Sequence, residues 1–112
     1  MSANWHEEAE LELIKAREAL KAGFKGRSRV SARRAAGLAV REYYRHQSAE
    51  VPPENLYKIL LRFSEHPALP NNIRLVSKHL CQRVDQSYSL PDNVDLVTDA
   101  EQLIQYLAEQ LD

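Results

Sequence analysis

Apolar residues recur every three or four positions along most of the chain, a spacing that places them on one face of an α-helix. No stretch alternates apolar and polar residues for long enough to indicate a β-sheet. The pattern therefore predicts five helices joined by short connections. The first helix ends at Gly23, and its apolar face consists of Trp5, Ala9, Leu13, Ala16 and Leu20. The second runs from about Arg27 to Arg45 and is followed by a polar loop over His46–Pro53, and the third covers Leu56–Phe63 and ends near Pro67. The fourth is opened by Pro70, Asn71 and Asn72, and the fifth covers Ala100–Leu111 with Thr98 or Asp95 as its cap.

Amphipathic helices with short connections favour one all-α domain over residues 1–112, an antiparallel four- to five-helix up-and-down bundle. The second helix is unusually rich in small residues. Its Ala32, Ala35, Ala36, Ala39, Val40 and Tyr43 share one side. Such a face indicates close approach to another helix, and we expect small-residue faces of this kind to support a homodimer.

The single cysteine, Cys81, excludes an intramolecular disulfide and a zinc site built on cysteines. The four histidines are scattered, without the spacing of a helical zinc site, and no glycine-rich phosphate loop is present. No apolar run approaches the length of a membrane-spanning helix. We therefore expect a cytoplasmic protein with no metal, no cofactor and no membrane partner.

The net charge is −1, so any attraction to an anionic partner must come from a local patch. The second helix offers one, because Arg27, Arg34 and Arg41 are seven residues apart and Arg45 follows four later. This stripe lies opposite the alanine face and suits phosphates or an acidic partner. The alternative is that the arginines pair with glutamates of the first helix, namely Glu7, Glu8, Glu10, Glu12 and Glu18.

Three stretches of the chain resemble the HEPN family of small prokaryotic helical bundles. The segment from Trp5 to Gly23 looks like the opening helix of that family, and Ala32–Arg41 is similar to its alanine-rich second helix. Leu69-Pro70, the Tyr88–Asp92 segment and the helix from Asp99 onward resemble its later turn, loop and final helix. The resemblance implies a homodimeric bundle whose members either cleave RNA or act as partner subunits of minimal nucleotidyltransferases, often in toxin–antitoxin or related stress systems.

Cleaving members of that family carry an Arg-x(4–6)-His motif late in the chain, where the histidine moves a proton and the arginine stabilises phosphate charge. Here Arg83–Tyr88 occupies that place, with tyrosine where the histidine would stand. Two other pairs fit the spacing, Arg41 with His46 and Arg74 with His79. Residues five apart lie ~140° apart around a helix, so each pair shares a face only where the helix ends or distorts.

The sequence thus leaves three hypotheses. The first is a non-catalytic HEPN-like module that presents Arg27, Arg34, Arg41 and Arg45 to a nucleotidyltransferase or to nucleic acid. The second is a metal-independent ribonuclease that uses one of the two Arg–His pairs. The third is a structural helical adaptor.

Overall fold

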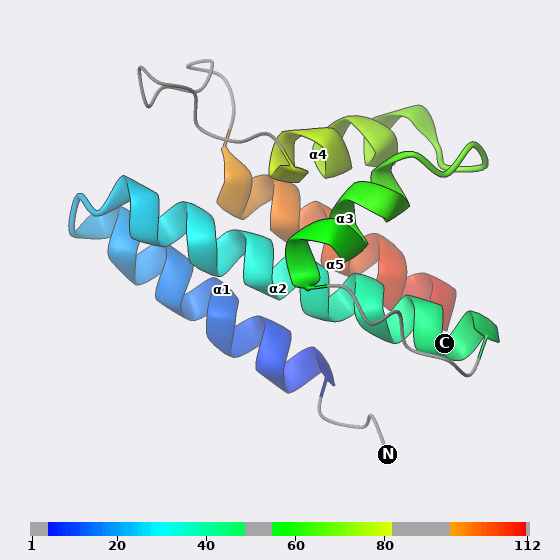
Figure 1. Ribbon diagram of the computed structural model, residues 1–112. Coiled ribbons are helices and arrows are strands. Elements are labelled where there is room, and N and C mark those ends of the chain that lie inside the picture. The colour runs from blue at the N-terminus through cyan, green and yellow to red at the C-terminus, as the bar shows by residue number, and fades with distance from the viewer. Residues whose placement is uncertain (1–4, 49–54, 82–94, 112) are drawn as a thin grey trace.

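The computed structural model describes residues 5–48, 55–81 and 95–111. Within these ranges the chain is all-helical, and its elements are α1 (Trp5–Lys21), α2 (Lys25–Ser48), α3 (Leu56–Ser64), α4 (Asn71–Cys81) and α5 (Leu96–Leu111). Helix α2 is central: it packs against each of the other four, and α1 borders only α2 and α5 (Figure 1). The predicted all-α bundle is confirmed.

A three-residue turn joins α1 to α2, and one of its positions requires glycine. Gly23 has a positive φ of 87°, the left-handed conformation that an L side chain disfavours. The amide of Phe24 donates to the carbonyl of Ala19 at 2.8 Å, and that of Gly23 to the carbonyl of Leu20 at 3.1 Å. These two bonds satisfy carbonyls at the end of α1 and reverse the chain, so that α1 and α2 run antiparallel.

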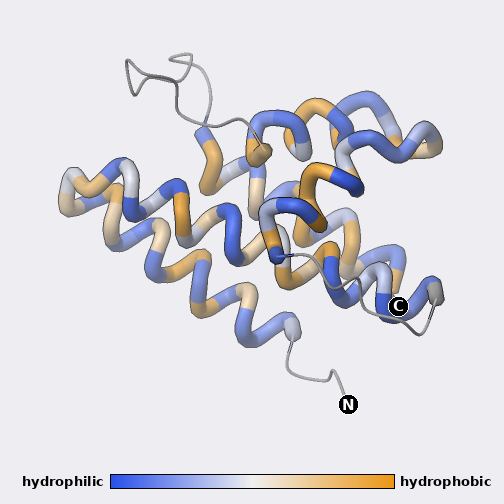
Figure 2. The backbone as a smooth tube through the Cα atoms, in the orientation of Figure 1, coloured by the Kyte–Doolittle hydropathy of each residue, from blue (hydrophilic) through white to orange (hydrophobic). Residues whose placement is uncertain are grey.

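The alanine face of α2 forms the middle of the core. Ala32, Ala35, Ala36 and Ala39 are each 0% exposed, on the helix that packs against each of the other four. Figure 2 shows hydrophobic and hydrophilic residues alternating along the helices, as expected for amphipathic helices around one core. The small-residue face is therefore used inside the bundle, and the homodimer stays a prediction.

Helix α3 lies very close to α2 at Gly37. A Cβ atom at this position would lie 2.7 Å from the Cβ of Leu56, the first residue of α3. Real carbon atoms pack about 3.5–4.0 Å apart, so only a glycine lets the two backbones come this near. This contact sets the position of α3 on the bundle.

Two helix boundaries refine the predicted ones. Helix α5 begins at Leu96 with Asp95 as its cap, because the Asp95 carboxylate accepts the backbone amides of Val97 and Thr98 at 3.0 and 3.2 Å. Thr98, the other predicted cap, lies inside the helix and donates its hydroxyl to Asp95 at 2.8 Å. Helix α2 continues to Ser48, so the prediction that a loop begins at His46 is wrong.

The additional turn of α2 has a local cause. Glu42 reaches forward to Arg45 and His46, three and four residues later, at 2.8 and 3.3 Å. Contacts at these spacings stabilise a helix, and cations near its carboxyl end also interact favourably with its dipole. The Glu42 side chain is only 1% exposed, so this turn is tied to the body of the bundle.

Candidate functional site

The four arginines of the predicted stripe all lie on α2 and, at spacings of seven and four residues, on one side of that helix. Arg27, Arg34 and Arg45 are exposed, and Arg41 is half-buried. We call these four residues the arginine ridge. From Arg27 to Arg45 the ridge extends over about 27 Å, given a rise of ~1.5 Å per residue.

The ion pairs of α1 do not involve the ridge. Arg17 takes Glu10 of its own helix at 3.5 Å and Glu101 of α5 at 2.8 Å, and Lys15 lies 3.6 Å from Glu12. Within residues 5–48, 55–81 and 95–111, no ion pair joins a ridge arginine to a glutamate of α1. The alternative of a ridge neutralised by the first helix thus finds no support among these contacts.

The four ridge arginines differ in their surroundings. The guanidinium of Arg27 lies 4.8 Å from the ring centroid of Phe24, a cation–π arrangement, and Arg45 pairs with Glu42. Arg34 and Arg41 have no carboxylate partner in the part of the chain that the structure describes. The centre of the ridge therefore carries two arginines able to bind an external anion.

Apolar side chains interrupt the ridge. Val30, between Arg27 and Arg34, is 48% exposed, and Leu38, between Arg34 and Arg41, is half-buried. Beyond the ridge, Phe24 is 52% exposed beside Arg27. The surface thus mixes fixed positive charge with apolar contacts, a composition typical of protein–protein interfaces.

The first predicted Arg–His pair, Arg41 with His46, lies on one uninterrupted helix. Because α2 neither ends nor breaks between these residues, the two side chains leave the helix ~140° apart. His46 instead turns toward Glu42, with Nε2 3.3 Å from a carboxylate oxygen. The structure does not bring this pair together.

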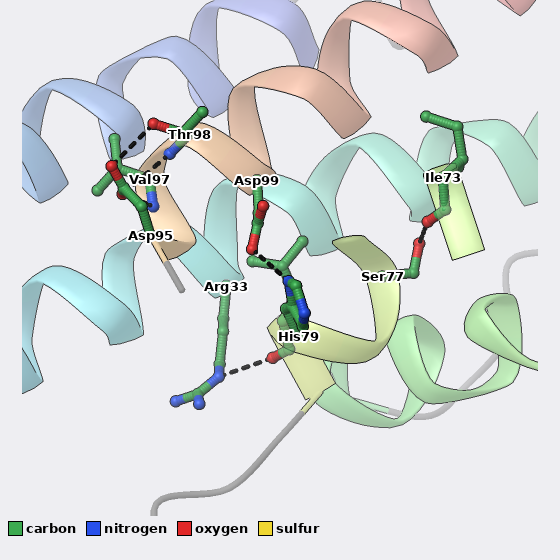
Figure 3. A network of polar contacts seen from close by, with 9 residues as sticks. Arg33, Ile73, Ser77, His79, Asp95, Val97, Thr98 and Asp99 are labelled. Atoms are coloured by element: carbon green, nitrogen blue, oxygen red, sulfur yellow. Dashed lines mark hydrogen bonds and ion pairs between the residues drawn. The ribbon is translucent and has the colours of Figure 1, made fainter. Parts of the chain in front are cut away.

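The second pair, Arg74 with His79, is also divided. Arg74 donates to the carbonyls of His66 and Pro67 at 3.2 and 2.8 Å, in the connection before α4. His79 contacts a different helix, with Nδ1 3.0 Å from Oδ2 of Asp99 on α5 (Figure 3). The sequence did not indicate the His79–Asp99 contact, because the two residues lie on different helices and no local motif links them.

The His79–Asp99 contact joins α4 to the first turn of α5. Burial raises the pKa of the Asp99 carboxyl, and the hydrogen bond from His79 opposes that rise. Close by, Nε of Arg33 donates to the carbonyl of Leu80 at 2.8 Å, which ties α2 to the end of α4 (Figure 3). These contacts hold three helices together at one end of the bundle.

Cys81 is buried at the end of α4, as expected for a small core residue. Burial raises the pKa of its thiol to about 11, which leaves almost no thiolate at neutral pH. In the described part of the chain, no group of three or more His, Cys, Asp or Glu residues could hold a metal ion. None of the described helices has both the length and the hydropathy needed to cross a membrane.

Arg83–Tyr88, the segment in the place of the HEPN motif, lies outside the described residues. Comparison of the chain with protein-family models, with curated proteins and with solved structures gives no match.

Proposed function

We propose that this chain is a non-catalytic, HEPN-like helical module that binds an acidic protein surface through its arginine ridge. A minimal nucleotidyltransferase is the partner that the family resemblance suggests. The observation that carries the proposal is the state of Arg34 and Arg41, which lie at the centre of the ridge and lack a carboxylate partner among the described residues. Arginine is the residue best suited to this task, because its planar guanidinium pairs with a carboxylate through two parallel hydrogen bonds.

The surroundings of the ridge favour a protein over a nucleic acid. Exposed Val30 and half-buried Leu38 break the line of charge and offer contacts that a phosphate backbone cannot use. Helix α1, which packs against α2, exposes Glu7, Glu8 and Glu18, and these carboxylates repel a polyanion that extends along the surface of the bundle. A carboxylate patch of limited size meets the arginines without reaching these glutamates.

The positions of the two Arg–His pairs support a non-catalytic role. A general base and the arginine that neutralises phosphate charge must converge on one reacting group. Here His46 faces Glu42, His79 faces Asp99, and Arg74 is held by two backbone carbonyls. The proposal therefore assigns no catalytic residue.

The test is affinity capture from the native cell with the full chain, followed by binding measurements on the purified partner. The variant is Arg34→Glu with Arg41→Glu, and the matched control is Lys58→Glu with Lys78→Glu, which reverses two exposed charges on α3 and α4. Wild type and control are expected to capture a nucleotidyltransferase with similar Kd. The ridge variant is expected to bind on the order of 100-fold more weakly, because each reversal replaces an attraction by a repulsion and together they cost about 3 kcal/mol.

If the ridge variant captured the partner as well as wild type does, the ridge would not be part of the interface. Capture of RNA in place of a protein, weakened by salt and by the same two reversals, would show that the ridge binds nucleic acid instead. Cleavage of mixed RNA in EDTA by the purified chain, lost in His79→Ala or His46→Ala, would establish the ribonuclease alternative instead.

A further inference from the structure

None of the described helices covers the outer face of α1, because among them α1 packs against α2 and α5 alone (Figure 1). One line of residues runs along this face at spacings of four, three and four, and we call it the outer stripe. It consists of Glu7, Leu11, Ile14 and Glu18. Leu11 is 59% exposed and Ile14 is 43% exposed, which is unusual for neighbouring large apolar side chains on a helix this well packed on its other face.

The ends of the outer stripe carry uncompensated charge. Glu7 and Glu18 are exposed and have no cation partner among the described residues. The stripe therefore offers two free carboxylates about 17 Å apart, with two apolar side chains between them.

The ridge side of α2 has the same spacing in the reverse direction, with complementary chemistry at three of the four positions. From Arg45 back to Arg34 the exposed or half-buried positions are again four, three and four residues apart. Two antiparallel helices laid along these lines face each other in four pairs, which are Glu7 with Arg45, Leu11 with Arg41, Ile14 with Leu38 and Glu18 with Arg34. Each carboxylate meets an arginine, and Ile14 meets the apolar side chain of Leu38.

We propose that the arginine ridge of one copy binds the outer stripe of α1 from a second copy. This goes beyond the proposed function, because it identifies what covers the ridge when the acidic partner is absent. The second copy and the partner use the same arginines, so each excludes the other. The ridge and the stripe are different surfaces, which makes the contact heterologous and lets it repeat from copy to copy.

The contact is short, about 17 Å of helix, and smaller than the interface of a stable dimer. It depends on the charge pairs that flank the apolar contact between Ile14 and Leu38. Self-association is therefore weak and strongest at low ionic strength, where screening of these pairs is least. The pair Glu18 with Arg34 is the best one to perturb, because both members lack another ion-pair partner among the described residues.

The test is sedimentation velocity of the full chain across a concentration series up to about 1 mM, in about 20 mM and in about 0.5 M salt. Wild type is expected to rise above its monomer mass of 12.9 kDa with concentration in low salt, and to return to it in high salt. Glu18→Arg and Arg34→Glu alone are each expected to weaken association at least ~10-fold. Glu109→Arg and Lys78→Glu, exposed reversals on α5 and α4, are the matched controls and should associate as wild type does.

Mixing the two single variants gives the sharpest outcome. The Glu18→Arg chain keeps a normal ridge and the Arg34→Glu chain keeps a normal outer stripe, so these two surfaces form the wild-type junction. The other two surfaces carry both reversals, so the charges at positions 18 and 34 are again opposite there. We expect an equal mixture to rise above the monomer mass of 12.9 kDa with concentration in low salt, as wild type does, although each variant alone associates at least ~10-fold more weakly. Circular dichroism of each variant checks that it is folded.

A wild type that stays monomeric at about 1 mM in low salt would overturn the inference, as would a mixture that fails to associate. Failure here is distinguishable from failure of the proposed function. Glu18→Arg leaves the ridge intact, so it should weaken self-association yet still bind the acidic partner, whereas Arg34→Glu should weaken both. A monomeric wild type whose partner binding still needs Arg34 removes only the self-association.

Discussion

The close approach of α3 to α2 can be tested by adding one methyl group at Gly37. In Gly37→Ala the new Cβ would lie 2.7 Å from the Cβ of Leu56, 3.3 Å from its Cγ and 3.4 Å from its Cδ2. The nearest atom is attached directly to the backbone of α3, so rotating a side chain cannot relieve the contact. Helix α3 must move away by roughly 1 Å to reach ordinary packing distance.

Two opposing effects determine the sign of this change. Overpacking a core by one methyl group lowers the free energy of unfolding by about 1–3 kcal/mol, and replacing glycine by alanine inside a helix raises it by up to ~1 kcal/mol. We expect a net loss of about 1–2 kcal/mol in the free energy of unfolding. In urea denaturation followed by circular dichroism, the midpoint should fall by roughly 0.5–1 M.

The other two glycines serve as controls because each isolates one effect. Gly26, near the start of α2, has nothing within 4 Å of an added Cβ, so Gly26→Ala should be neutral or stabilising by up to ~1 kcal/mol. Gly23 also has open space, but its φ is +87°, so Gly23→Ala should cost about 1 kcal/mol through backbone strain alone. A Gly37→Ala chain as stable as Gly26→Ala would refute the close-packing argument. Adding Leu56→Ala should not rescue Gly37→Ala, because alanine keeps the Cβ that makes the 2.7 Å contact.

Further predictions concern Cys81, Asp99 and Asp95. The pKa of Cys81, raised from 9.0 to about 11, predicts alkylation at pH 8 roughly 100-fold slower in the folded chain than in urea, and a similar rate in both would refute it. As pH rises, the thiol loses its proton at a lower pH in the unfolded chain than in the folded one. The contribution of Cys81 to the free energy of unfolding is therefore complete below pH ~9 and is lost as pH rises through about 11. The urea midpoint of wild type should fall over this range, and that of Cys81→Ala should not. Asp99→Ala should cost about 1–2 kcal/mol by leaving Nδ1 of His79 without its acceptor, while Asp99→Asn, which keeps an acceptor oxygen, should cost less in the same titration. Asp95→Ala should cost about 1 kcal/mol by removing the cap of α5, and an unchanged thermal midpoint would show that the cap is dispensable.

The number of helices and their inward faces could be predicted from the sequence, because a helix repeats every ~3.6 residues and only a packed face can be consistently apolar. The outward position of the arginine ridge follows from the same periodicity, since it lies opposite the alanines that the core requires. The residue at which α2 ends could not be predicted in this way. The sequence shows polar residues after Arg45, whereas a buried carboxylate at Glu42, which holds Arg45 and His46, continues the helix to Ser48.

The sequence by itself determined an all-helical chain with one basic helix, because both properties depend on which residues recur at a fixed local spacing. Only the tertiary structure decided what those residues contact. It buried the alanine face inside the bundle, directed His79 to Asp99 across two helices, and left Arg34 and Arg41 without a carboxylate partner among the described residues. The physical reason is that pairing and burial depend on distances between elements remote in the chain, and helix periodicity carries no information about those distances.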